Sequence, residues 1–219
     1  MNLIVPVDAA EIIKLEYSRS VRSRIIKLVE QGYILANEAT RHVSFLNWDL
    51  GKRHEGYLRP LAINYLFKKD IEQNLLPLSY SYEFNKNKSH KYLVFQKGNV
   101  KMTLSQTSTS KSVARPAFFR DKLQETNQIR FNLFNEEMIL NDSPEYYMLL
   151  TYSSGGETPR FINIGMPGKD AWIEKVNLLS EPHLVQIDGQ DIDKEEVIQQ
   201  ENLIGLKQFV KEVEEGGGK

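Results

Sequence analysis

The chain has 219 residues, of which 41% are hydrophobic and 26% are charged, and it contains no cysteine. These values are ordinary for a globular protein of one domain or two small ones. The lack of cysteine excludes disulfides, thiolate catalysis and Cys-based zinc sites, and it is typical of a reducing cytoplasm.

The net charge of −1 hides a strong asymmetry along the chain. Residues 1–135 carry 21 Lys+Arg and 12 Asp+Glu, a balance of +9, whereas residues 136–219 carry 7 and 17, a balance of −10. Each part therefore has its own electrostatic field. Either the two parts attract each other within one fold, or the basic part binds a polyanion and the acidic part a basic partner.

The N-terminal region is predicted to be helical. Apolar residues recur at three- and four-residue steps over residues 9–36, which predicts one long helix. Its opposite face carries cations, among them Arg19 and Arg22. Residues 43–51 are predicted to be irregular, and a second helix is predicted over residues 59–73.

A strand over residues 78–84 and a β-hairpin over residues 91–106 are predicted next. Gly98 and Asn99 form a two-residue turn of the kind that matches the native twist of two strands. This turn sets the register of the hairpin. The predicted opposite pairs are Phe95 with Met102, Leu93 with Leu104, and Gln96 with Lys101.

The rest of the chain alternates between loops and short elements. The predicted elements are a hydroxyl-rich loop at 105–112, a helix at 113–126, a strand at 129–134, a hairpin at 146–164, a helix at 171–179 and a C-terminal helix at 190–215. We therefore expect an α+β fold with N-terminal helices, a central antiparallel sheet with hairpins, and a C-terminal helix.

We expect a single compact domain over residues 1–215. It comprises a helical part at 1–76, a sheet-rich part at 77–189 and the C-terminal helix, and a disordered tail follows at 216–219.

No motif predicts a reaction. The four histidines, His42, His54, His90 and His183, form no HxxxH or HExxH pair, and the chain has no GxSxG, GxxxxGK[ST] or GxGxxG pattern. We therefore predict a non-enzyme with no catalytic residue, no metal ligand and no cofactor.

One catalytic alternative stays open. Nucleases of the restriction-enzyme type hold a divalent cation with an acidic residue and an acid-x-Lys triplet on the next strand. Glu83 ends a predicted strand, and Lys97 and Lys101 lie on the hairpin, but Gln96 directly precedes Lys97 and neither hairpin strand carries acid-x-Lys. A divergent metal-dependent nuclease is therefore one hypothesis, ranked after binding to a protein and binding to nucleic acid.

Cations and aromatic residues interleave around the hairpin. Lysines and arginines neutralise phosphates, hydroxyl groups add hydrogen bonds, and aromatic rings stack on bases, although lysines also protect sheet edges and aromatic residues also pack in strands. The candidate residues for nucleic-acid or anion binding are Arg19, Arg22, Lys52, Arg53, Lys91, Lys97, Lys101, Arg115 and Arg120.

The acidic C-terminal helix suggests a protein partner. Its carboxylates and narrow apolar seam suit docking into a partner groove, and equally suit packing on this chain's own sheet. A protein partner is the leading expectation, while nucleic acid and self-association remain open. We expect no membrane association and a cytoplasmic location, because Met1–Val7 form only a short apolar run before Asp8 and Glu11.

Three stretches resemble a poorly characterised group of bacterial and prophage proteins. The group looks like the antitoxin-type partners that are encoded beside metallopeptidase-like toxins or phage-defence genes. The stretches are Phe45-Leu46-Asn47-Trp48-Asp49-Leu50-Gly51-Lys52-Arg53, Ser105-Gln106-Thr107 with Ala114-Arg115, and Pro159-Arg160-Phe161-Ile162-Asn163-Ile164-Gly165 followed by Trp172. The resemblance implies a non-catalytic binding protein that restrains a partner protein, and it assigns no functional residue.

Overall fold

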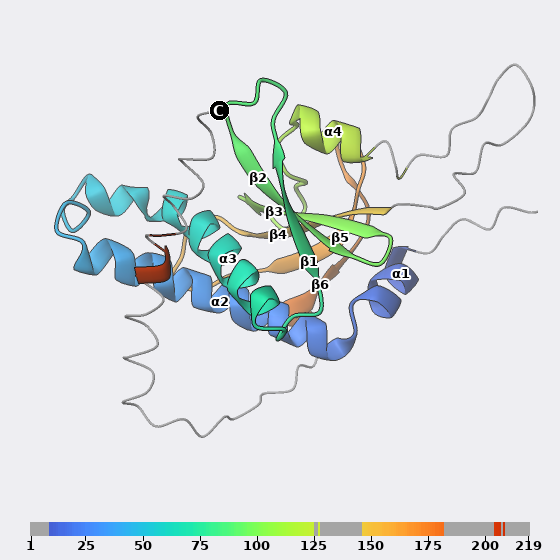
Figure 1. Cartoon of the computed structure of the whole chain (residues 1–219), viewed down its shortest axis with the longest axis horizontal. Helices are drawn as coiled ribbons and strands as arrows, with labels where there is room; N and C mark the ends of the chain where they lie inside the picture. The colour runs from blue at the N-terminus through green and yellow to red at the C-terminus, as the bar shows by residue number, and fades with distance from the viewer. Residues whose placement is uncertain (1–8, 125–126, 128–145, 182–203, 207, 209–219) are drawn as a thin grey trace, which may run out of the picture.

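The computed structural model describes residues 9–124, 127, 146–181, 204–206 and 208 (Figure 1). The predicted strand at 129–134, the predicted tail at 216–219 and most of the predicted C-terminal helix lie outside these residues. Residues 204–206 and 208 are helical, in agreement with that last prediction as far as they reach.

The N-terminal region forms two helices where one was predicted. Helix α1 spans Ala9–Glu16 and helix α2 spans Arg19–His42. Ser18 has extended backbone angles (φ −52°, ψ 161°), so the helix stops there and the fully buried Tyr17 turns into the core. The side chain of Arg22 donates to the Tyr17 carbonyl at 2.5 Å, which secures the break.

The second predicted helix begins earlier than expected. A 3-10 helix η1, Gly51–His54, leads into α3, Glu55–Glu72, and places Pro60 inside the helix. Because proline has no N–H, the carbonyl of Gly56 loses its usual helical partner. Gln106 Nε2 donates to that carbonyl at 3.0 Å, so a side chain from the sheet replaces the missing hydrogen bond.

Six strands form one sheet in the order β1-β2-β3-β4-β5-β6. The strands are β1 Ser79–Phe84, β2 Lys91–Lys97, β3 Val100–Thr107, β4 Tyr146–Ser153, β5 Ile162–Pro167 and β6 Trp172–Asn177. The α+β class is confirmed, but β3 and β4 pair in parallel while the other neighbours are antiparallel. The sheet is therefore mostly antiparallel, and the parallel pair of β3 and β4 was not predicted.

Two predicted helices differ from the structure. The helix predicted at 171–179 is wrong, because these residues form β6 and the short 3-10 helix η3, Leu178–Ser180, and pairing with β5 completes the sheet. The helix predicted at 113–126 is shorter, since α4 spans Phe118–Gln124. Pro116 disfavours a helical conformation at the residue before it, which delays the start of α4.

The helices lie on opposite faces of the sheet. One face, with Phe95, Met102 and Met148, packs into the core with α1, α2 and α3, and Phe67 of α3 lies 5.3 Å from Phe95 between ring centroids. The alternate residues face the other way. There Phe119 of α4 stacks on Tyr92, while α2 and α3 run alongside each other on the first face (Figure 1).

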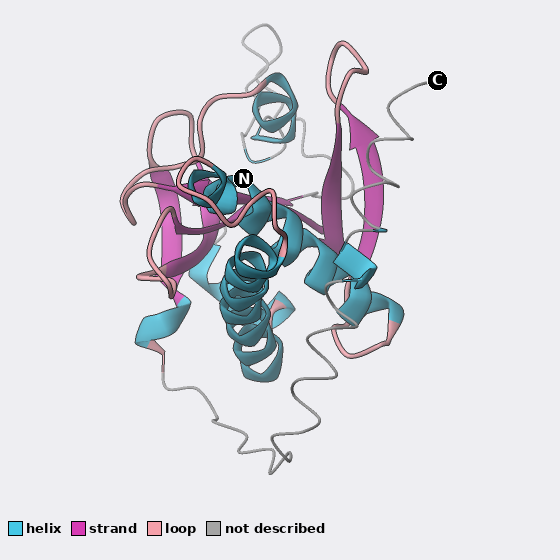
Figure 2. Cartoon of the chain, turned by 90° about the vertical axis from the view of Figure 1, so that its left-hand side faces the viewer, coloured by secondary structure: helices cyan, strands magenta, loops and turns pink. Residues whose placement is uncertain are grey.

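The hairpin of β2 and β3 matches the prediction only near its turn. Phe95 pairs with Met102 and Gln96 with Lys101, as predicted, but the ladder contains three pairs and ends there. The predicted pair of Leu93 and Leu104 is wrong, because the strands diverge. By contrast, β1 and β2 form six pairs and β3 and β4 form eight. The β1–β2 hairpin arm (residues 79–97) thus stands away from the rest of the sheet at its far end (Figure 2).

Within the described part of the chain, the helices are too short or too polar to cross a membrane.

Helices α2 and α3 approach closely at Gly32. A Cβ atom at this position would overlap Ile63 Cγ1 and would lie 3.2 Å from the Ile63 Cα. We expect Gly32→Ala to lower the free energy of unfolding by about 1–2 kcal/mol, because overpacking costs more than the gain in helix propensity of ~1 kcal/mol. Gly56→Ala, which meets open space, is the control. Urea denaturation measures both, and a Gly32→Ala variant as stable as the wild type would contradict the close packing.

Candidate functional site

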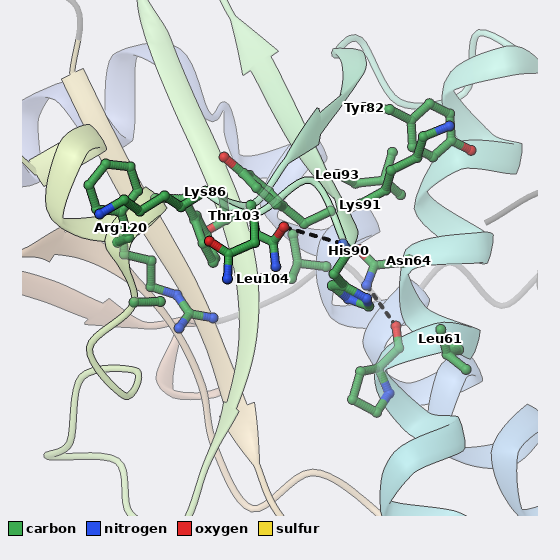
Figure 3. Close-up of a pocket in the computed structure, with 17 residues that line it drawn as sticks. Leu61, Asn64, Tyr82, Lys86, His90, Lys91, Leu93, Thr103, Leu104 and Arg120 are labelled. Atoms are coloured by element: carbon green, nitrogen blue, oxygen red, sulfur yellow. Dashed lines mark hydrogen bonds between the residues drawn. The ribbon is translucent and has the colours of Figure 1, made fainter. Parts of the chain in front are cut away.

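A pocket of about 640 Å³ opens where β2 and β3 diverge. Figure 3 shows Arg120 of α4 on one side of it and Leu61 and Asn64 of α3 on the other. The 17 lining residues come from α3, the hairpin arm, β3 and the start of α4. They are Pro60, Leu61, Asn64, Tyr82, Asn85, Lys86, Asn87, His90, Lys91, Tyr92, Leu93, Thr103, Leu104, Ala117, Phe118, Phe119 and Arg120.

Helix α4 spans the divergence between the two strands. In a continued ladder Tyr92 of β2 would lie opposite Ser105 of β3, by extension of the observed register. Instead, the ring of Phe119 stacks on Tyr92 at 4.0 Å between centroids and an interplanar angle of 26°. The neighbouring Arg120 places Nη2 3.4 Å from the hydroxyl oxygen of Ser105. Two adjacent residues of α4 thus contact the two separated strands.

The pocket is positively charged. Its lining contains Lys86, Lys91 and Arg120 but no Asp or Glu. Among the described residues, these three cations form no ion pair. Lys86 and Lys91 instead lie over aromatic rings, Lys86 at 5.2 Å from the Phe118 centroid and Lys91 at 5.2 Å from that of Phe84. Cation–π contacts leave a cation's charge in place, so the pocket attracts anions.

Arg120 is the most deeply placed of the three cations. Its Nη1 donates to the Arg115 carbonyl at 2.8 Å, and its guanidinium lies over the Phe119 ring at 4.7 Å. Burial lowers its pKa from the ordinary value, while the neighbouring Tyr147 and Asp121 act in the opposite direction. Its Nε is buried and has no hydrogen-bond partner among the described residues.

Amide side chains shape the remaining wall. Asn85 Oδ1 accepts from the backbone N–H groups of Ser89 at 3.0 Å and His90 at 3.3 Å, which folds the loop of the hairpin arm. Asn64, which also lines the pocket, donates from Nδ2 to the Pro60 carbonyl at 2.8 Å (Figure 3). The pocket therefore combines cations, aromatic rings and amide hydrogen-bonding groups.

The predicted binding residues separate into three groups. Lys91 and Arg120 line the pocket. Arg22 and Lys97 make internal contacts, since Arg22 pairs with Glu181 at 2.6 Å and Lys97 donates to the Glu16 carbonyl of α1. The remaining residues do not line the pocket: Arg19 begins α2, Lys52 and Arg53 lie in η1, Lys101 is half-buried on β3, and Arg115 is exposed before α4.

Several pocket residues were absent from the predicted set. Lys86 follows the same run of cations and aromatic residues as Lys91, and Phe118 and Phe119 directly precede Arg120, so the sequence pattern contained these signals. The contribution of Asn64 had no such signal, because only the packing of α3 against the sheet brings this residue to the pocket.

The nuclease hypothesis receives no support from the geometry. Glu83 accepts a hydrogen bond from the Tyr92 hydroxyl at 3.1 Å. Within the ranges that the structure describes, no group of three or more His, Cys, Asp or Glu residues gathers as a metal site. Lys97, one of the two lysines considered for that site, donates to the Glu16 carbonyl of α1.

Comparisons with protein-family models, with curated proteins and with solved structures find no match for this chain. The resemblance to antitoxin-type proteins therefore stays a prediction, and the function is argued from the pocket.

Tyr92, which lines the pocket, makes the free energy of unfolding depend on pH. Burial, the charge of Glu83 and the hydrogen bond to Glu83 all raise the pKa of Tyr92 above its ordinary value of 10.0. The folded chain therefore favours the neutral phenol, so this stabilisation is complete below about pH 9 and is lost as the pH rises. We expect Tyr92→Phe to lose less stability than the wild type between about pH 9 and 11, measured by urea denaturation. Equal losses would show that Tyr92 titrates as it does in the unfolded chain.

Proposed function

We propose that this chain is a cytoplasmic nucleic-acid-binding protein whose contact surface is the pocket between β2, β3, α3 and α4. The observation that carries the proposal is a lining with three cations, several aromatic rings and no carboxylate. The cytoplasmic part of the proposal is supported by the absence of cysteine.

The lining matches the chemistry of a nucleotide chain. Lys86, Lys91 and Arg120 supply charges for phosphate oxygens. The lining also contains the aromatic rings of Tyr82, Tyr92, Phe118 and Phe119, and bases stack on aromatic rings with little dependence on sequence.

A further cation lies close to the pocket. Lys88 is exposed in the loop of the hairpin arm, and Lys86 and His90 of the same loop line the pocket. A small anion would need only the pocket, whereas a chain of phosphates can also contact this flanking cation. This extension favours a polymeric anion.

The proposal predicts a defined dependence on salt. Three phosphate contacts on a single strand give a log–log slope of about −2, and therefore a loss of about 20-fold in affinity between ~50 and ~200 mM salt. Fluorescence anisotropy of a labelled mixed-sequence oligonucleotide measures this loss. We expect the variant Lys86→Glu with Lys91→Glu to bind at least roughly tenfold more weakly than the wild type at the lower salt, with a shallower slope.

The double variant Lys52→Glu with Arg53→Glu is the matched control. It makes the same change in net charge, but its residues lie in η1 outside the pocket. Retained affinity in this control would support the pocket as the contact surface. Equal losses in both variants would indicate binding by overall charge alone, and an absence of binding by the wild type at both salts would refute the proposal.

A second candidate function is binding to a partner protein through the α2–α3 tip, residues 43–57. The tip exposes large apolar side chains, with Phe45 71%, Trp48 54%, Leu50 50% and Tyr57 74% accessible. Exposed apolar residues that gather at one place are typical of protein interfaces, where tyrosine and tryptophan contribute most of the binding energy. The resemblance to antitoxin-type proteins includes this stretch, which supports a role in restraining a partner.

The tip hypothesis is tested by loss of a specific complex. We expect a protein that co-purifies in stoichiometric amounts with the wild type to be lost from a variant with Phe45→Ser and Trp48→Ser. The control Ile173→Ser changes an apolar residue of similar exposure, 59%, on β6. Retention by the control but not by the tip variant would support the hypothesis, and the same set of proteins on all three chains would contradict it.

A further inference from the structure

We infer that the pocket receives one unpaired base of a nucleic-acid strand between the separated strands β2 and β3, so that the chain recognises single-stranded segments and discriminates against uninterrupted duplex. This inference rests on the proposed nucleic-acid binding and specifies its ligand. Four observations carry it: the end of the β2–β3 ladder, the size of the pocket, the groups on its walls and the placement of its cations.

The first observation is the early end of the ladder. In an antiparallel pair, alternate residue pairs exchange main-chain hydrogen bonds. Counting from the two-residue turn, Lys97 with Val100 and Phe95 with Met102 occupy the exchanging positions, and the next would be Leu93 with Leu104. The ladder ends before this pair, and both residues line the pocket. The divergence thus presents main-chain donors and acceptors toward the pocket, in addition to side chains.

The second observation is the volume of about 640 Å³. Pockets of about 300–1,000 Å³ suit small-molecule ligands, which includes a single nucleotide unit. A DNA duplex instead turns its bases inward, and its stacked pairs would have to open before a base entered a recess of this size. Only an unpaired nucleotide therefore reaches the inner wall without that cost.

The third observation is the chemistry of the inner wall. Tyr92 and Phe119, which are stacked on each other, both line the pocket. Asn64 of α3 lies across the pocket from Arg120 (Figure 3). Unpaired bases are recognised through stacking on aromatic rings and hydrogen bonds to their edges. The Leu61, Leu93 and Leu104 side chains supply apolar contact for the rest of a base.

The fourth observation is that two of the cations belong to the hairpin arm. Lys86 lies in the loop of the arm and Lys91 begins β2. Arg120 of α4 lies across the pocket from Lys91 (Figure 3), while the Lys86 amine lies over the Phe118 ring of α4, on the Arg120 side. Phosphates on both sides of an inserted nucleotide therefore have a cation available from each wall. A strand that passes over the pocket opening places its backbone at the cations and its base in the interior.

The test compares three labelled DNAs of one sequence by anisotropy, each about 12 nucleotides long, which falls within the size range of single-strand sites. They are the single strand, the perfect duplex, and the duplex with one extra unpaired nucleotide at its centre. We expect the single strand to bind at least tenfold more tightly than the perfect duplex. We also expect the single unpaired nucleotide to restore most of that difference.

A variant that fills the pocket without changing its charge separates the contribution of the base to the affinity from that of the phosphates. Leu61→Trp adds bulk on the α3 wall, and Leu75→Trp adds the same bulk at an exposed leucine outside the pocket. We expect Leu61→Trp to reduce the preference for the single strand to less than threefold, while its weak, salt-dependent duplex binding is kept. Leu75→Trp should retain the full preference. Circular dichroism and the melting temperature confirm that both variants fold, and Leu104→Phe serves as a second filling variant if Leu61→Trp does not.

The outcomes distinguish the two proposals. Equal affinity for the single strand and the perfect duplex, or an unchanged preference in both folded filling variants, would overturn the inserted base and leave nucleic-acid binding standing. No binding of any of the three DNAs, and none of the corresponding RNA strand, would overturn both.

Discussion

The divergence of β2 from β3 is the constraint on which the candidate site depends. Three ladder pairs join these strands at their turn, and α4 contacts both where they separate, through the Phe119–Tyr92 stack and the Arg120–Ser105 contact. Neighbouring strands of a sheet normally pair their backbone N–H and C=O groups along their whole length, because an unpaired buried group costs free energy. Here the chain gives up main-chain pairs and gains a lined recess, which is the kind of local departure from ideal structure that marks a functional site.

The elements around this divergence are held by contacts that leave the pocket cations available. Arg24 pairs with Asp70 to join α2 and α3, Arg22 pairs with Glu181, and Lys97 caps the Glu16 carbonyl of α1. These cations stabilise the scaffold on the helical face. Lys86 and Lys91, in contrast, lie over aromatic rings and keep their charge for a ligand. The basic character of the first 135 residues therefore has two separate uses.

A hydrogen bond between α3 and β3 also connects the helical face with the pocket. Pro60 interrupts the hydrogen bonding of α3 at Gly56, and Gln106 of β3 restores it from the sheet. This contact connects the start of α3 with β3, and the next residues of α3, Leu61 and Asn64, line the pocket. The exposed α2–α3 tip lies beyond this contact and carries a distinct apolar surface. The pocket proposed to bind a base and the tip proposed to bind a protein are thus separate surfaces, which separate variants can test.

The sequence by itself determined the α+β class, the turn at Gly98-Asn99 with the pairs next to it, and the presence of cations and aromatic residues around the hairpin, because these depend on local periodicity and turn chemistry. It did not determine the parallel pairing of β3 with β4, because these strands lie far apart in the chain. It also missed the strand at 172–177, which pairs with the neighbouring β5 but lacks a clear alternation of buried and exposed residues. The candidate site was predicted from the sequence only in part. Lys91 and Arg120 were predictable as cations, but only the tertiary structure brought them together with Asn64, since packing of α3 and α4 against opposite faces decides where the strands separate.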